Sequence, residues 1–173
     1  MNARAFFSAS HEGFAFAGSS LPYDFDANAA SVVVAAYNPA IANGLLRYFH
    51  ASPFQALIAP SHARVMETLR ESVVRGARPA AVVLELSMQS TESLKTIAAI
   101  RRMHPNVKIL AIGNYTMPSL VKLVFKSGAD GYLLSMPSRE TMLEAIETLL
   151  NDSPALDEQL AYIRFALGER FAA

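Results

Sequence analysis

The histidines of this chain are not spaced as metal ligands usually are, and we assign none of them to a metal. They lie far apart in the sequence, at His11, His50, His62 and His104. The chain has no cysteine, which excludes disulfides, thiolate metal sites and cysteine catalysis. Ser135 and Ser138 have no histidine at a meaningful spacing, so they do not indicate a serine nucleophile. We therefore assign no catalytic residue, no metal and no cofactor.

The elements that would position a site alternate between strands and helices. Apolar runs predict five buried strands, at residues 31–36, 55–59, 80–86, 107–112 and 131–134. Helical spacing predicts helices at residues 39–49, 63–75, 91–103, 118–128 and 139–150. Asn38 and Ser138 are the expected N-caps of the first and last of these helices. This alternation predicts an α/β fold with a doubly wound, five-stranded parallel sheet over residues 31–150.

The two ends of the chain differ from this pattern. Residues 1–30 hold six of the sixteen aromatic residues, interrupted by glycine, serine and proline, and are predicted to form an irregular arm. We favour a tail that packs on the domain or is partly disordered; the alternative is a segment that docks on a partner. Residues 151–173 are predicted to carry an extra helix, from Leu156 to about Phe171.

This last helix would carry a narrow apolar stripe, made of Leu156, Leu160, Ile163, Leu167 and Phe171. Such a stripe is too apolar to stay exposed on a monomer. It must pack on its own domain, on a second copy or on a downstream domain. We predict a homodimer, because a symmetric pair needs only one self-complementary face.

Composition excludes several classes of protein. The 173 residues fit one domain with an extension, and 15 basic residues balance 15 acidic ones. That balance argues against a broad basic face for nucleic acid. With 52% apolar and 17% charged residues, the chain is not of the disordered class. No run approaches the about 18 apolar residues of a membrane span, and the N-terminus is a poor signal peptide. We expect a cytoplasmic globular domain without membrane contact.

Three stretches carry a resemblance to a known family. They are VVLELSM (Val82–Met88), AIRRMHPNVKILAI (Ala99–Ile112) and SGADGYLL (Ser127–Leu134). Over about residues 31–150 the chain resembles a bacterial response-regulator receiver domain of the NarL/FixJ type, whose receiver precedes a LuxR-type helix-turn-helix. The resemblance implies a flavodoxin-like sheet with strand order 2-1-3-4-5. It also implies a role in signal transduction and transcription regulation.

Receivers of this family are phosphorylated on an aspartate at the end of the third strand. Two acidic residues after the first strand hold Mg²⁺, a hydroxyl residue and a lysine bind the phosphoryl group, and an aromatic residue in the fifth strand changes position. In this chain, Ala36 and Tyr37 stand at the positions of the acidic pair, and Glu85 stands at that of the phosphoacceptor. Gly113 replaces the hydroxyl residue and Ser135 replaces the lysine. Only the aromatic position is kept, as Tyr132.

These replacements all act against the same reaction. One carboxylate offers too few ligands for Mg²⁺, and without Mg²⁺ and the lysine nothing neutralises an incoming phosphoryl group. Glu85 is also one methylene longer than aspartate. The resemblance therefore predicts a degenerate receiver that is not phosphorylated and is not an enzyme.

Several roles stay open for the residues at this edge of the sheet. One possible role of Glu85 is to mimic the phosphorylated state. The other is that of an ordinary carboxylate, either solvated or bonded to Tyr37 or Asn38, and we favour this second role. Arg139 could pair with Glu85. Tyr37 would fill the former acidic pocket by packing. The alternative is a small-molecule site lined by Tyr37, Glu85, Asn114 and Ser135.

Our leading hypothesis is a non-enzymatic signalling module that regulates through protein–protein contacts. A face around Lys122 and Lys126 is either solvated or contacts that partner. The second hypothesis is a sensor of a small ligand, and the third is a phosphorylatable receiver that uses Glu85. The stretch IRFALGERFAA (Ile163–Ala173) resembles the linker helix before a LuxR-type domain. We expect contact with DNA only through a helix-turn-helix beyond Ala173.

Overall fold

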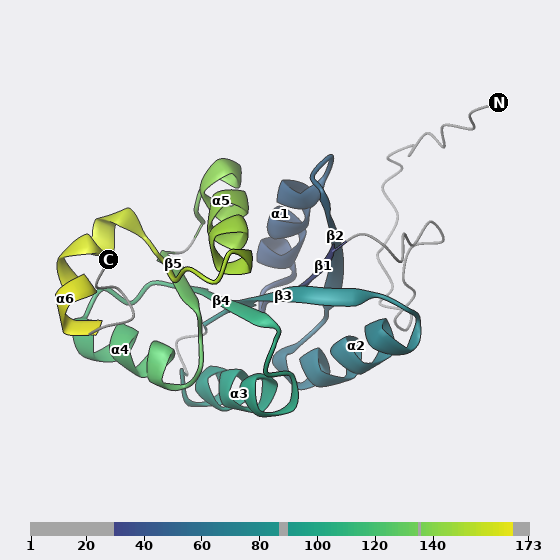
Figure 1. The fold of residues 1–173 in the computed structure, drawn as a ribbon, viewed down its shortest axis with the longest axis horizontal. Coiled ribbons are helices and arrows are strands. Elements are labelled where there is room, and N and C mark those ends of the chain that lie inside the picture. Colours follow the sequence, from purple (N-terminus) through teal and green to yellow (C-terminus); the bar gives the residue numbers. More distant parts are fainter. Residues whose placement is uncertain (1–29, 87–89, 135, 168–173) are drawn as a thin grey trace.

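The computed structural model describes residues 30–86, 90–134 and 136–167, in which strands and helices alternate (Figure 1). The strands are β1 (Ala30–Ala35), β2 (Phe54–Ala59), β3 (Arg78–Glu85), β4 (Lys108–Gly113), β5 (Gly131–Leu134) and β6 (Ala155–Leu156). The helices are α1 (Pro39–Phe49), α2 (His62–Val74), α3 (Ser90–Met103), α4 (Pro118–Lys126) and α5 (Arg139–Leu150), followed after β6 by the 3₁₀ helix η1 (Glu158–Ile163) and α6 (Arg164–Leu167). Within these residues, no helix is long and apolar enough to cross a membrane.

The strands form one parallel sheet in the order β2-β1-β3-β4-β5-β6. The predicted doubly wound sheet and its order 2-1-3-4-5 are confirmed, and β6 is a sixth strand that the sequence did not predict. Val34 of β1 lies between Ile58 of β2 and Val83 of β3. Because the strands are parallel, their carboxyl ends finish at one edge of the sheet, which we call the rim.

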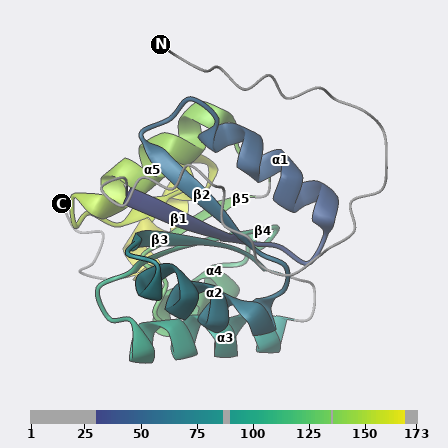
Figure 2. The ribbon, with the colours of Figure 1, turned by 90° about the vertical axis from the view of Figure 1, so that its right-hand side faces the viewer.

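Helices cover both faces of the sheet, with α1 and α5 on one side and α2, α3 and α4 on the other (Figure 2). Successive residues of β1 therefore enter different cores. Val33 packs into the cluster under α2, α3 and α4, whereas Val32 and Val34 pack into the cluster under α1 and α5. Burial on both faces explains why the central strands are continuous apolar runs.

The predicted N-caps of the first and last domain helices are confirmed. The Asn38 side chain accepts a hydrogen bond from the backbone N–H of Ala40 at 2.9 Å, with proline in the first turn of α1. The Ser138 hydroxyl accepts one from the backbone N–H of Thr141 at 3.1 Å. Each cap satisfies an N–H that the helix itself leaves unpaired, so these two residues fix where α1 and α5 leave the rim.

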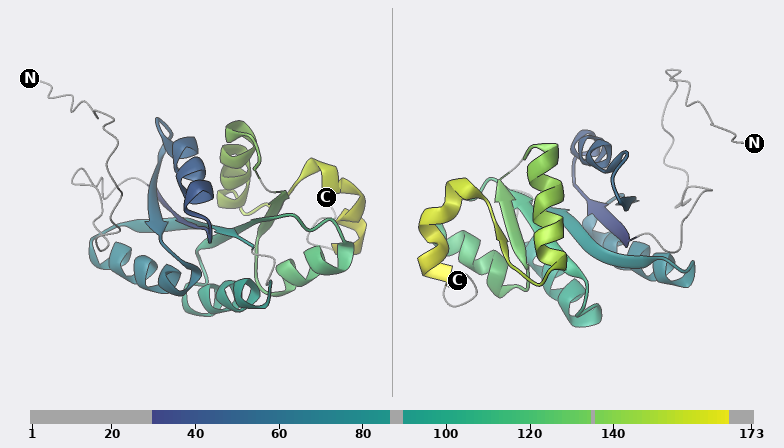
Figure 3. Two further views of the ribbon diagram at one scale, coloured as in Figure 1. Left: turned by 180° about the vertical axis from the view of Figure 1, so that it is seen from behind. Right: turned by 45° about the horizontal axis from the view of Figure 1, so that its top comes forward.

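The segment after α5 corrects the prediction of one long helix. It forms β6, which pairs with β5, and then the short helices η1 and α6. Leu160 and Ile163, each 1% exposed, join the core beside α4, and Leu156 is buried there too. Figure 3 shows the segment lying against α4 and β5.

The predicted dimerisation stripe is therefore wrong for its described members. The side chains of Leu156, Leu160 and Ile163 are covered by their own domain, and Leu167 packs against the same cluster. A single helical period suggested a free apolar face, but strand and 3₁₀ geometry direct the same residues inward. Phe171 lies outside the described residues, as do residues 1–29 of the predicted arm.

Candidate functional site

The rim is where an open parallel sheet usually holds its functional residues. Ala36 and Tyr37 follow β1, Glu85 ends β3 and Gly113 ends β4. Ala36 is buried at 3% exposure, whereas Tyr37 is 40% exposed. Ser135, the matching position after β5, lies outside the described residues. The structure thus brings the four other rim positions to the carboxyl ends of neighbouring strands.

The Glu85 carboxylate is hydrogen-bonded to the backbone that follows the neighbouring strand, β1. Its Oε2 accepts a hydrogen bond from the backbone N–H of Tyr37 at 3.0 Å. This is the bonded, partly solvated carboxylate that we favoured from the sequence. The suggested ion pair with Arg139 is wrong: that guanidinium donates instead to the backbone carbonyl of His50 at 3.2 Å.

A buried histidine, His62, lies beside Tyr37, although its spacing from the other histidines did not mark it as a site residue. His62 begins α2 and is only 2% exposed, and its ring lies 4.0 Å from the Tyr37 ring between centroids, tilted by 43°. Neither ring nitrogen has a hydrogen-bond partner of normal geometry. The feature of the sequence that could have indicated His62 was its position shortly after β2, where the chain leaves the rim.

Burial lowers the pKa of His62 below the ordinary value for histidine. The nearby Glu85 backbone and the Glu92 carboxylate oppose that shift, but burial has the larger effect. The imidazole is consequently neutral at pH 7. A neutral ring can pack against the ring of Tyr37, and the two rings are in contact at the position after β1.

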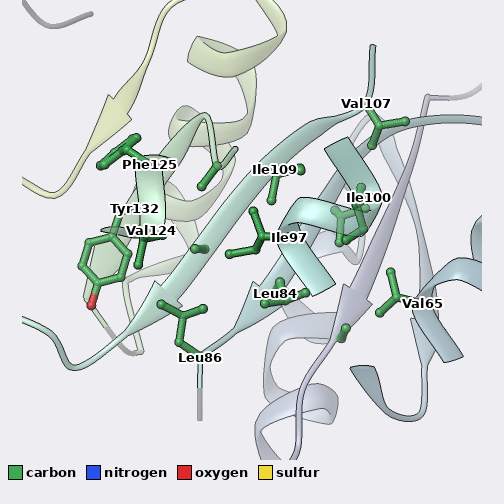
Figure 4. Packing of buried hydrophobic residues seen from close by; sticks show 14 of the residues in the cluster. Val65, Leu84, Leu86, Ile97, Ile100, Val107, Ile109, Val124, Phe125 and Tyr132 are labelled. Atoms are coloured by element: carbon green, nitrogen blue, oxygen red, sulfur yellow. The ribbon is translucent and has the colours of Figure 1, made fainter. Parts of the chain in front are cut away.

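Tyr132 of β5 fills the space next to Gly113. It is fully buried, and its hydroxyl accepts a hydrogen bond from the backbone N–H of Tyr115 at 2.7 Å. Figure 4 shows its ring next to Val124 at the edge of the core cluster. A Cβ atom on Gly113 would lie 3.2 Å from the Tyr132 hydroxyl oxygen and 3.1 Å from the Cβ of Leu86. Glycine at this position therefore makes room for the inward tyrosine.

The environment of Tyr132 keeps its phenol protonated. Burial raises its pKa far above the ordinary value for tyrosine, and the hydrogen bond from the Tyr115 backbone only partly offsets this. A neutral phenol can accept the Tyr115 N–H and also donate its own proton. The side chain can thus be both a core residue and a polar anchor for the loop after β4.

Few acidic side chains lie at the described positions of the rim. Among the described residues, no group of three or more histidine or acidic side chains is arranged to hold a metal ion. Glu85 is the one acidic residue among the described rim positions, and it already bonds to a backbone N–H. Lys122 and Lys126 are exposed on α4, as a solvated or partner-binding face would be.

Comparisons with known proteins match this fold and the order of its elements. No protein-family model matches the chain. It is 28% identical to the nitrate/nitrite response regulator protein NarP of Escherichia coli over 136 residues, which is 66% of this chain and 63% of NarP. It is 25% identical to the transcriptional regulatory protein DegU of Brevibacillus brevis over 77 residues, 44% of this chain and 33% of DegU. The chain thus spans less than two thirds of each relative.

Solved structures show the same fold. A LuxR-family two-component response regulator from Aurantimonas superposes with a TM-score of 0.68 at 18% identity, over 84% of this chain and all of that one. The isolated REC domain of RcsB from Salmonella enterica serovar Typhimurium, with BeF₃⁻, superposes with a TM-score of 0.64 at 15% identity, over 79% of this chain and 99% of that one.

The sheet order and the helices on both faces are those of the receiver fold in these solved structures. The similarity to NarP and DegU, together with the LuxR-family structures, supports a receiver domain of the NarL/FixJ, LuxR type.

Proposed function

We propose that this chain is an atypical receiver that signals without being phosphorylated and acts through protein–protein contacts in transcription regulation. The observation that carries the proposal is the state of Glu85. Its carboxylate bonds to the Tyr37 backbone at the position of the phosphoacceptor, and no second carboxylate stands in the acidic-pair positions, Ala36 and Tyr37. Mg²⁺ needs several hard oxygen ligands, and this arrangement supplies one.

The packing around Glu85 supports the same proposal. Tyr37, at an acidic-pair position, packs its ring against His62, and the Tyr132 hydroxyl lies 3.2 Å from where a Cβ on Gly113 would stand. A phosphoryl group would have to displace these contacts without Mg²⁺ to balance its charge. Tyr132 is held inward by the Tyr115 backbone. We therefore propose that the domain keeps one fixed rim conformation and catalyses no phosphotransfer to itself.

The test is exposure of the full chain to acetyl phosphate and Mg²⁺, followed by intact-mass measurement. We expect no added phosphoryl mass, while a phosphorylatable receiver treated in parallel gains it. An adduct that peptide mapping assigns to Glu85 would overturn the proposal in favour of the phosphorylatable alternative. Mg²⁺ should also leave the melting temperature equal to that in a matched salt, since a bound ion stabilises the folded state.

Partner contact is proposed to use exposed surface and not the buried C-terminal stripe. Met117 and Leu123 are exposed large apolar residues, Leu123 on α4 and Met117 directly before it, and Lys122 and Lys126 lie on the same helix. If a homodimer forms, its interface must lie on a surface of this kind, because Leu160 and Ile163 are covered in the monomer. Sedimentation measurements give the oligomeric state directly.

Contact with DNA is proposed only through a separate helix-turn-helix domain, as the LuxR type implies. We favour the proposed signalling role over the ligand-sensing alternative, because the Tyr37 ring packs against His62 and one Glu85 oxygen already accepts a backbone N–H.

A further inference from the structure

The segment Ala155–Leu167, which we name the clasp, covers the outer edge of β5. Asp157 is its main anchor. The Asp157 backbone N–H donates to the Tyr132 carbonyl at 2.9 Å, and its Oδ2 accepts from the Leu134 backbone N–H at 3.0 Å. Its Oδ1 also accepts from the Gln159 N–H at 3.0 Å and caps η1. One residue thus joins the clasp to β5 and starts its helical part.

The clasp also holds the loop between β4 and α4, residues 114–117. The Tyr162 hydroxyl, on a side chain that is itself 64% exposed, donates to the backbone carbonyl of Thr116 at 2.6 Å. Leu160 and Ile163 pack into the core cluster that contains Val121 of α4. The loop and the start of α4 therefore lie under the clasp, which Figure 3 shows beside α4.

Two adjacent residues of this loop are held by two different tyrosines. Tyr132 of β5 accepts the N–H of Tyr115, and Tyr162 of the clasp donates to the carbonyl of Thr116. Tyr132 itself is bound to the clasp, because its carbonyl accepts the N–H of Asp157. These bonds form a closed circuit from β5 to the clasp, from the clasp to the loop, and from the loop back to β5.

We infer that the clasp and the 114–117 loop open together, as one conformational unit that links the rim to the C-terminal end of the domain. Opening the clasp removes the bond to Thr116 and the apolar cover of α4, so the loop loses part of what holds it while the bond between Tyr115 and Tyr132 remains. Opening the loop likewise breaks the contact that fixes Tyr162. The biological meaning of this coupling rests on the proposed signalling function, but its existence does not depend on whether Glu85 accepts phosphate.

Amide hydrogen exchange on the full chain, resolved by NMR, tests the coupling. The amides of Asp157 and Leu134 report on the clasp, and the amide of Tyr115 reports on the loop, because each donates a bond described above. Asp157→Ala removes the two side-chain bonds of the anchor, to the Leu134 and Gln159 N–H groups, and keeps its backbone bond to Tyr132. Tyr162→Phe removes only the hydroxyl bond to the loop. Tyr48→Phe is the matched control, since its hydroxyl also donates to a backbone carbonyl, that of Pro137 at 2.8 Å, but between α1 and the start of α5.

Asp157→Ala should speed exchange about tenfold at the amide of residue 157 and at that of Tyr115, the change that loss of a typical hydrogen bond makes in a local opening equilibrium. Tyr162→Phe should speed exchange at Tyr115 and Asp157 together, and Tyr48→Phe should change neither. Faster exchange at Asp157 with wild-type exchange at Tyr115 would overturn the inference.

The Tyr162 variant distinguishes coupled local opening from unfolding of the whole domain. If Asp157→Ala also exposes the amides of α5, the whole domain has opened, and Tyr162→Phe then decides the question because its side chain is largely exposed. Unchanged exchange at the amides of Asp157 and Tyr115 in Tyr162→Phe refutes the coupling. The phosphodonor experiment separately decides the proposed function, so the two can fail independently.

Discussion

Adding one methyl group at Gly113 tests whether the inward Tyr132 depends on that glycine. In Gly113→Ala the new Cβ would meet the Tyr132 oxygen at 3.2 Å and the Leu86 Cβ at 3.1 Å. Both neighbours must move by a few tenths of an ångström, and overpacking of a core typically destabilises by about 1–3 kcal/mol. The loss of glycine's freedom in the unfolded chain returns about 0.4–1 kcal/mol. We therefore expect a net destabilisation of about 1 kcal/mol.

A double-mutant cycle with Tyr132→Phe isolates the contact with the hydroxyl. Tyr132→Phe alone should destabilise by about 1–2 kcal/mol, because the buried hydroxyl loses its bond with the Tyr115 N–H. In the Tyr132→Phe background the Gly113→Ala change meets only Leu86, so it should be milder by at least about 0.5 kcal/mol. Urea unfolding followed by circular dichroism gives all four free energies of unfolding. Additive effects would refute the idea that Gly113 and Tyr132 are matched to each other.

Three further changes follow from burial and charge. Because burial lowers the pKa of His62 below 6.5, the unfolded chain binds its proton more readily than the folded domain, so stability should fall as pH drops below 6.5. The slope is at most about 1.4 kcal/mol per pH unit, and urea titrations should show it reduced in His62→Phe. Ile163→Asp should destabilise the domain by at least about 3 kcal/mol in thermal or urea unfolding, since it places a charge at a site with 1% exposure. The exposed Ala161→Asp on the same 3₁₀ helix should have little effect. Glu85→Gln should stay within about 0.5 kcal/mol of wild type, because an amide oxygen can still accept the Tyr37 N–H; a larger loss would show that the charge itself matters.

The sheet could be predicted because each part of its sequence carries a local signal. Runs such as SVVVAA before Asn38-Pro39 combine a strand buried on both faces with an N-cap and a proline that fits the first helical turn. Repeated along the chain, that combination allows one α/β arrangement. The positions at the rim followed from the strand ends, which is why Tyr37, Glu85 and Gly113 lie together as expected.

The clasp and His62 could not be predicted in the same way because tertiary contacts determine them. Strand β6 has only two residues, Ala155 and Leu156, and its pairing with β5 is accompanied by a bond from the distant Leu134 N–H to the Asp157 carboxylate. The apolar spacing of Leu156, Leu160 and Ile163 fits a helix equally well. A single histidine such as His62 carries no spacing signal, and its burial depends on Tyr37, which is distant in sequence.

The replacements at the rim are better understood as one set of contacts than as separate losses. Gly113 leaves the space that the Tyr132 hydroxyl uses, and Tyr37 supplies both the N–H that binds Glu85 and the ring that covers His62. Each residue thus meets a group that another rim residue provides. An acidic side chain at position 37 would remove the ring that lies beside the buried His62, and a hydroxyl residue at position 113 would press its Cβ against the Tyr132 hydroxyl. We therefore expect a single change at either position to disturb a contact that another rim residue makes.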